Sequence, residues 1–354
     1  MKFMDLQAQL EDNRRSVAFD SYDISVRQLY DMTLEGMIDI APDYQRHFVW
    51  DEARQSELIE SLFLGIPVPT LYMATNRDSS WEVIDGLQRL TTIINYVGSL
   101  DVIKEVNAKG SKLKISSLEK LSSLNGTRYE DLPKSLQVMF QTRPIRVTVL
   151  NDRSDNSVRY DLFERLNTGG VNLHPQEIRN CVYTGEFNDF IKELSMNDSF
   201  RNVVKVTKSS ANKGVYEELV LKFFCYYEQR DKFVHNVKEF LNDYMESKTK
   251  SFKNKVRLRN IFEQTFNELE RSLPNGIVRG NRLNVTPMVL FEAIAIGTAD
   301  VIDNDIAVRQ GVIQDLLDNE ALKKLTSGAT NSRKRLHDRI NFVKDAIEHD
   351  FRNN

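Results

Sequence analysis

The sequence has 354 residues, of which 41% are hydrophobic and 28% charged, and 48 Lys and Arg against 51 Asp and Glu give a formal net charge of −3. This composition excludes a disordered or collagen-like chain, and the charge balance excludes a wholly basic surface while leaving room for a local basic patch. Two cysteines, Cys181 and Cys225, exclude a disulfide framework and a cysteine-based zinc site. No apolar segment is long enough to cross a membrane and the N-terminus lacks a signal-like core, so we expect a cytoplasmic protein with no membrane partner.

Short β-branched or aromatic runs predict four strands in the first half of the chain, at residues 37–40, 71–74, 81–84 and 145–150. Between them, Asp51 is placed to cap a helix that includes residues 56–64, and the segment from Gly65 to Pro69 ends it. A second helix should begin directly after Asp85-Gly86. Residues 101–135 are polar and are typical of a long insertion with a helical piece.

Helical periodicity dominates from about residue 155 to the end of the sequence. Apolar residues at helical spacing predict a helix over 158–166, and Pro175 fits the first turn of another helix, which Gly185 could close. A length of 354 residues also favours two domains over one. We therefore predict an α/β domain at 1–155 and an all-α domain at 156–354, with the boundary anywhere in the interval 155–185.

The segment from Trp81 to Thr92 predicts a strand, a tight turn and a helix, and it is the best candidate for a functional site. Backbone N–H groups at a helix N-terminus bind anions, and Gly86 would let a phosphate approach them. Arg89 offers a bidentate fork, Thr91 and Thr92 offer hydroxyl groups, and Asp85 could hold a metal ion or polarise water. The alternative is an ordinary Asp-Gly turn with Arg89 as a surface cation, and the segment is not a Walker A loop.

Two further segments mix aromatic, polar and glycine residues. In the first, Tyr44, Gln45 and Arg46 precede a Val49-Trp50 pair, a pattern that could stack a base and hold a phosphate, or simply pack a core. In the second, Asn167 begins an Asn-Thr-Gly-Gly sequence that could end a helix or close over a ligand.

Basic residues gather in two runs. Either run could be a solvated helix face or a contact for nucleic-acid phosphates. The second run consists of Arg333, Lys334, Arg335, His337 and Arg339. The first, which we predict to bind nucleic acid, consists of Lys248, Lys250, Lys253, Lys255, Arg257 and Arg259.

Taken together and in this order, the segments resemble the N-terminal domain of GmrSD-type (type IV) modification-dependent restriction enzymes, which has a ParB/sulfiredoxin-like fold. That family shows an aromatic–Gln–Arg segment ending in Val-Trp, a helix with a Pro-x-Pro stop, a strand ending in Asp-Gly-Gln-Gln-Arg-Leu-Thr-Thr, and a Phe-x-Arg-x-Asn-Thr-Gly box. The matching segments here are 44–50, 58–69, 85–92 and 163–170. The sequence departs from the family at Leu87, which replaces the first Gln of its motif and either weakens the nucleotide site or faces the core.

The resemblance implies an NTP-binding and NTP-hydrolysing module, dependent on Mg²⁺, in a prokaryotic restriction or anti-phage system that senses DNA, including modified DNA. It assigns Asp85, Gln88 and Arg89 to catalysis, with Mg²⁺ near Asp85. It assigns nucleotide binding to Gly86 and to Arg46 opposite Arg89, with Tyr44 and Gln45 from the same box, Thr91 and Thr92 from the motif, and Asn167 from the last box.

Two other functions stay open. One is a nucleotide-gated DNA-binding switch that does not hydrolyse the nucleotide, and the other is a nickase or nuclease in its own right. Many relatives carry a C-terminal HNH nuclease, and no such motif follows residue 200, so a separate nuclease subunit is an expected partner. Whether the chain forms a homo-oligomer stays open.

Overall fold

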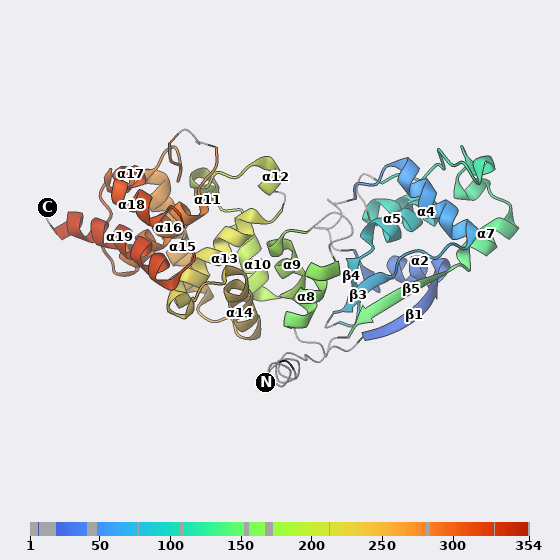
Figure 1. Ribbon diagram of the computed structural model, residues 1–354, viewed down its shortest axis with the longest axis horizontal. Coiled ribbons are helices and arrows are strands. Elements are labelled where there is room, and N and C mark those ends of the chain that lie inside the picture. Colours follow the sequence, from blue (N-terminus) through green and yellow to red (C-terminus); the bar gives the residue numbers. More distant parts are fainter. Residues whose placement is uncertain are drawn as a thin grey trace. The chain divides into compact units, whose positions relative to one another are not determined.

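The computed structural model describes residues 6, 19–40, 48–76, 78–106, 110–151, 156–166, 173–211, 213–280, 284–328 and 330–352. The chain divides into two compact units, Met1–Asn172 and Leu173–Asn354, and the division falls inside the 155–185 interval expected from the sequence (Figure 1). A mixed sheet with helices builds the first unit, and the described part of the second unit is helical. The predicted order, an α/β domain followed by helices, is confirmed.

The sheet of the first unit has five strands in the order β1-β5-β3-β4-β2. β5 lies between β1, to which it is antiparallel, and β3, to which it is parallel. β4 is antiparallel to β3 and parallel to β2. The four predicted strands are present with slightly shifted ends. The strands are β1 (Phe19–Ser25), β2 (Ile38–Asp39), β3 (Leu71–Thr75), β4 (Trp81–Asp85) and β5 (Pro144–Leu150).

The sequence did not predict β1. Its first five residues are exposed, and only Ile24 is buried, so the strand lacks the apolar alternation by which a half-buried strand is recognised. Its pairing with β5 defines it: Tyr22 lies opposite Val147, and Ile24 lies opposite Ile145. Hydrogen bonds between segments more than a hundred residues apart therefore stabilise a strand with weak local preference.

Helices cover the sheet of the first unit. Buried side chains from α2, α4 and α5 form one core with one face of the sheet, including Leu29, Ile59, Leu71, Ile94 and Val147. The helices are α2 (Val26–Leu34), α4 (Glu52–Leu64), α5 (Leu87–Val97), α6 (Leu100–Val106), α7 (Lys134–Gln141) and α8 (Asn156–Leu166), with short 3₁₀ turns η1 (Ser122–Leu124) and η2 (Tyr129–Asp131).

Local signals set both ends of α4, as predicted. Asp51 is its N-cap, and the side chain accepts a hydrogen bond of 2.8 Å from the Arg54 N–H. Gly65 is its C-cap in the left-handed conformation. The Arg54 guanidinium also lies over the Trp50 ring, 4.8 Å from its centroid, so the chain entering this helix is held by its backbone and by its side chains.

Helix α8 belongs to the first unit, although the sequence assigned residues from 156 onward to the helical domain. It packs on β4, and its side chains Val158, Tyr160 and Phe163 are buried. On the strands, Ala74 and Leu150 are buried outside the main core, because neighbouring strand residues face opposite sides of the sheet. Periodicity identified this helix correctly, but it carries no information on which unit the helix covers.

The second unit contains the remaining helices. The sequence expected Gly185 to close the helix at Pro175, but α9 ends at Val182, and Gly185 is instead the N-cap of α10. The elements are α9 (Pro175–Val182), α10 (Glu186–Leu194), α11 (Asp198–Val203), α12 (Lys208–Ala211), α13 (Val215–Gln229), η4 (Arg230–Lys232), α14 (Val237–Lys250), α15 (Lys255–Ser272), α16 (Met288–Asp303), α17 (Val312–Leu317), α18 (Glu320–Leu325) and α19 (Arg333–Arg352).

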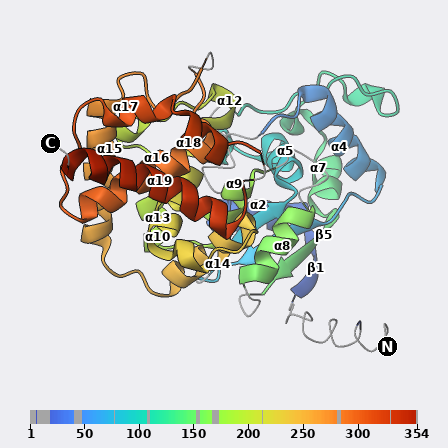
Figure 2. The same ribbon diagram turned by 60° about the vertical axis from the view of Figure 1, so that its left-hand side comes forward.

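Helix α16 lies at the centre of the second unit, and every residue from Leu290 to Val301 is buried. It packs along α19, and α18 also lies against α19 (Figure 2). Gly297 permits the close approach, since a Cβ there would lie 2.8 Å from the Cβ of Val343 on α19. The core of this unit is therefore built by close helix packing.

A chain of charged side chains is buried inside the second unit. Glu218 lies 3.4 Å from Arg179 and 3.5 Å from Lys222, and Lys222 lies 3.8 Å from Glu292, which in turn binds Arg339. Burial raises the pKa of Glu218, but the charges of Lys222, Arg179 and His174 outweigh burial and leave this pKa below its ordinary value. The alternating charges compensate one another where water is largely excluded.

No helix within the described residues is long and apolar enough to cross a membrane.

Candidate functional site

The turn between β4 and α5 is tight, and Gly86 makes it possible. Gly86 has φ +106°, a conformation that favours glycine, and a Cβ at this position would lie 2.3 Å from the Leu71 side chain on β3. The first helical hydrogen bond runs from the Leu90 N–H to the Gly86 carbonyl. Within the described residues, no side chain caps this end of the helix. The N-terminus of a helix attracts anions, and close packing on Leu71 is a sufficient reason for the glycine.

Arg89 lies in the first turn of α5 and binds the chain around it. Its guanidinium donates to Asp85 at 2.7 Å, to the Thr70 carbonyl at 3.0 Å and to the Pro69 carbonyl, and its side chain is only 12% exposed. In this conformation Arg89 links the β4–α5 turn to the segment that enters β3. The expectation that its fork binds a phosphate stays a prediction, and it requires an exchange of at least one of these partners.

Gln88 ties the second motif to the first. Its side-chain oxygen accepts hydrogen bonds from the backbone N–H groups of Val49, at 3.0 Å, and Trp50, at 3.2 Å. On the other side, Gln55 Nε2 donates to the Trp50 carbonyl at 3.1 Å, and Asn95 Nδ2 donates to Gln55 Oε1 at 3.1 Å. We call Gln88, Gln55 and Asn95 the amide clamp. Because Gln88 and Asn95 both lie on α5, the clamp fixes both backbone polar groups of Trp50 to that helix.

Two predicted site residues are buried instead. Thr91 is 1% exposed and Thr92 is fully buried, with its hydroxyl donating to the Gln88 carbonyl at 2.7 Å. The helical period turns both toward the core, and their contact with a nucleotide stays a prediction. Leu87 is partly buried and packs against the core, which agrees with the second of the two readings given for its departure from the family motif.

The remaining residues of the two flanking motifs, Tyr44, Gln45, Arg46 and Asn167, lie outside the described residues. What the structure gives is the chain next to them. Val49 and Trp50, the last two residues of the first motif, reach α5 through the amide clamp. Helix α8, whose last residue is Leu166, packs on β4, the strand that leads into the turn. Both flanking motifs are thus joined to segments that contact β4 or α5.

Binding of Mg²⁺ near Asp85 stays a prediction. The described residues contain no group of three His, Cys, Asp or Glu side chains that could hold a metal ion, and Mg²⁺ is commonly held by one or two carboxylates together with substrate phosphates. The carboxylate of Asp85 is paired with the Arg89 guanidinium at 2.7 Å, so a positive charge already occupies the position that a cation would take. We derive no chemical step through a metal ion.

Most cations of the first basic run form ion pairs with carboxylates. Lys248 lies 2.6 Å from Glu228, Lys250 lies 2.7 Å from Glu246, and Lys255 lies 3.0 Å from Glu186. Arg259 forms two hydrogen bonds of 2.7 Å with Glu193, and Arg257 lies 2.9 Å from Asp303. Lys253 is the one member of this run for which the described residues provide no ion pair. Lys250–Glu246 lies within α14, and the other four pairs join α14 or α15 to other helices. Binding of nucleic acid by this run stays a prediction.

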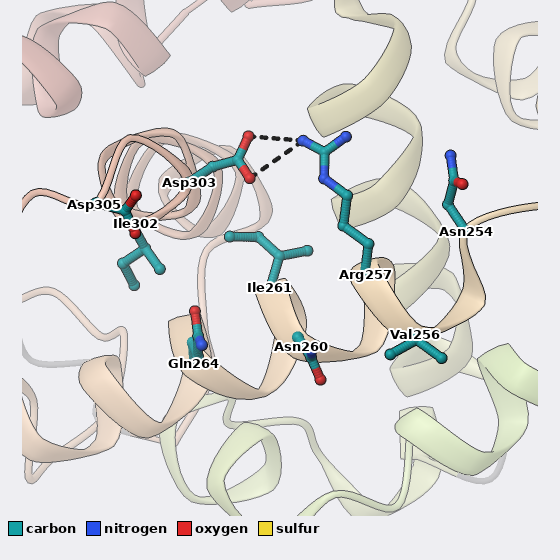
Figure 3. A pocket seen from close by; sticks show the side chains of 9 residues that line it. All are labelled: Asn254, Val256, Arg257, Asn260, Ile261, Gln264, Ile302, Asp303 and Asp305. Carbon is teal, nitrogen blue, oxygen red and sulfur yellow. Dashed lines mark hydrogen bonds and ion pairs between the residues drawn. The ribbon is translucent and has the colours of Figure 1, made fainter.

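Figure 3 shows the hollow beside Arg257, between the start of α15 and the end of α16. The Arg257 guanidinium donates to the Asp303 carboxylate across the hollow, and Asn260 and Gln264 line the hollow from the same helix as Arg257. A second carboxylate, Asp305, stands at the rim. The negative charges beside Arg257 make this hollow unfavourable for a phosphate.

Comparison with known proteins identifies the part of the chain that carries the site. Residues 26–184, a little under half of the chain, match the family described as the GmrSD restriction endonuclease N-terminal domain. This segment is similar to a GmrSD N-terminal domain. It contains the β4–α5 turn, the amide clamp and α8, so every contact described above around Arg89 and Gln88 lies within the matched segment.

Two other comparisons add little. A solved structure of a Pnob8-like ParB-N domain matches over 95% of this chain and 98% of its own, with 12% sequence identity and a TM-score of 0.23, and so low a score carries no argument. No curated protein matches the sequence. The inferences about the matched segment therefore rest on the family match and on the geometry of its own residues.

Proposed function

We propose that this chain is a nucleotide-binding module of a prokaryotic restriction or anti-phage system, in which NTP binding and hydrolysis at the start of α5 control contact with DNA. The observation that carries the proposal is the N-terminus of α5, which no side chain of the described residues caps and which has Arg89 in its first turn. The matched domain family, described as a restriction endonuclease, supports the biological setting and DNA as a partner.

The convergence of the three motifs supports the same position. Gln88 binds the last two residues of the first motif, and α8, which contains the start of the last motif, packs on β4. A nucleotide offers phosphates for the helix amides and a base for aromatic residues, such as those of the first motif. Each motif would thus contact a different part of the same nucleotide.

Hydrolysis is the second half of the proposal, and Asp85 is the residue that could orient water. A switch that binds the nucleotide without hydrolysing it is the other candidate. Two observations favour the switch: the Gln88 side-chain oxygen is already engaged by two amides, and the Asp85 carboxylate is already paired with Arg89. Multiple-turnover release of phosphate, with and without DNA, decides between the two.

The test is calorimetric titration of the four NTPs into the wild type and three variants. One charge-assisted fork is worth about 1.5–3 kcal/mol, so Arg89→Ala should weaken NTP binding about 10- to 150-fold, and Arg89→Lys should recover only part of the loss. The matched control is Arg146→Ala, which removes an exposed arginine paired with Asp23 in the same unit and should leave the affinity unchanged. Full affinity in a folded Arg89→Ala protein would end the proposal.

A further inference from the structure

The first turn of α19 has an unusual charge. Arg333, Lys334 and Arg335 follow one another there, and the turn contains no acidic residue. A helix N-terminus carries a partial positive charge from the backbone dipoles, so acidic residues are favourable at that end and cations are unfavourable. Three consecutive cations at the start of a 20-residue helix therefore cost stability, which suggests that they are there for a reason other than folding.

Two other segments bring cations to the same place. The Arg335 guanidinium donates to the Lys324 carbonyl at 3.3 Å, which joins the end of α18 to α19. The Arg333 N–H donates to the Val234 carbonyl at 3.1 Å, and η4, which ends at Lys232, contacts α19. Contacts from two segments thus surround the same turn of α19. We call Lys232, Lys324, Arg333, Lys334 and Arg335 the α19 corner.

The charges of the α19 corner are largely uncompensated. Within the described residues, Lys232, Lys324, Lys334 and Arg335 form no ion pair, and the first three are exposed. Arg333 faces Asp231 at 3.9 Å, with both side chains mostly exposed.

Within the described residues, the nearest acidic residues form no ion pair with Lys232, Lys324, Lys334 or Arg335. Glu320 and Asp318 pair with Lys323, at 2.9 and 4.0 Å, and Asp338 lies one turn further along α19. The first basic run differs, because its lysines and arginines have carboxylate partners at 2.6–3.0 Å in five of six cases.

We propose that the α19 corner binds the phosphate backbone of double-stranded DNA. Exposed lysines without intramolecular partners lose nothing when they meet phosphates, and each contact releases condensed counterions from the duplex. The partial positive charge that the backbone dipoles give to the helix N-terminus adds to the same attraction. The corner lies in the second unit, outside the matched domain, and the proposal does not depend on the nucleotide site.

The test compares two triple variants with the same loss of charge. In one, Lys232→Gln, Lys324→Gln and Lys334→Gln neutralise the corner. In the matched control, Lys114→Gln, Lys120→Gln and Lys134→Gln neutralise three exposed lysines of the first unit, which also form no ion pair within the described residues. Binding of a fluorescent duplex is measured over a series of salt concentrations.

The slope of log K against log salt should become flatter by about 2–3 in the corner variant, because each phosphate contact contributes about 0.9, and the affinity at about 0.15 M salt should fall roughly 100-fold. The control should keep the wild-type slope. An unchanged slope in the corner variant, or equal losses in both variants, would overturn the proposal. Binding to vesicles of anionic lipid without binding to DNA would also overturn it.

Stability provides a second readout. Because the dipole makes a cation unfavourable at Lys334, Lys334→Gln alone should leave the melting temperature unchanged or raise it. A lower melting temperature would show that this lysine serves the fold, and it would contradict the proposal.

Discussion

Gly86→Ala should strongly destabilise the first unit, and the structure gives two separate reasons. At φ +106° an alanine is strained by about 1–3 kcal/mol. Its Cβ would also lie 2.3 Å from Cδ2 of Leu71, which is fully buried, and such overpacking costs about 1–3 kcal/mol. The expected loss is therefore about 2–6 kcal/mol, a large part of the free energy of unfolding of an ordinary domain.

A double-mutant cycle with Leu71→Ala separates the two reasons. Leu71→Ala alone should cost about 2–5 kcal/mol, because it leaves a cavity in the core. In the double variant the clash is gone and only the backbone strain remains, so the total should be smaller than the sum by about 1–3 kcal/mol. The two tryptophans, Trp50 and Trp81, both belong to the first unit, so their fluorescence during denaturant unfolding follows this unit alone.

Additive losses in this cycle would refute the packing argument. A Gly86→Ala protein with wild-type stability would refute the whole reasoning. If that stable variant also failed to bind NTP, the glycine would serve the approach of a phosphate, as the sequence first suggested.

Three further predictions follow from contacts already described. Gln88→Leu removes the acceptor for two backbone amides, so it should lower the free energy of unfolding by about 1–3 kcal/mol and speed hydrogen exchange at residues 48–55. Gln88→Glu still accepts these hydrogen bonds and should lose much less stability. Equal exchange rates in both variants would contradict the amide clamp. Charge reversal at Lys253, Lys255 and Arg257 should weaken DNA binding less than the three substitutions in the α19 corner, because Lys255 and Arg257 are ion-paired. A larger effect of the charge reversal in a salt series would show that the first basic run is the main DNA contact. Since the pKa of Glu218 is lowered, its ion pairs stabilise the protein at neutral pH, and this contribution is lost as the pH falls below 4.5. Glu218→Gln should therefore lower the melting temperature at pH 7 and differ less from the wild type in acid. A difference in melting temperature that does not change with pH would contradict this prediction.

Features set by neighbouring residues could be predicted from the sequence. Helix α4 is an example, because its caps Asp51 and Gly65 stand next to the apolar positions that they frame. The strand, turn and helix around Gly86 are another, since the whole signal lies within a dozen residues. Both were placed with nearly correct ends.

Features set by distant partners could not be predicted. The role of Gln88 depends on the amides of Val49 and Trp50, some forty residues away in the chain, and no local pattern marks an acceptor for them. The motif likewise suggested a ligand for Thr91, whereas the phase of the helix turns that residue inward.

The basic run shows the same limit for charge. Its cations are conspicuous in the sequence because they lie within a dozen residues, while four of their carboxylate partners lie on α10, α13 and α16. The segment therefore contains the cation of each of these four pairs without its carboxylate. The partners become visible only when the helices are packed.

The position of β5 in the sheet affects the order in which the first unit can fold. β5 is the last strand of the unit along the chain, yet it lies between β1 and β3 and pairs with both. During synthesis, β1 has no partner strand until the ribosome has released residues 144–150, more than a hundred residues later. Pairings of such long sequence separation form slowly and leave strand edges exposed in the meantime. An expression fragment that ends before Pro144 therefore lacks the strand that joins the two parts of the sheet, and it should aggregate rather than fold.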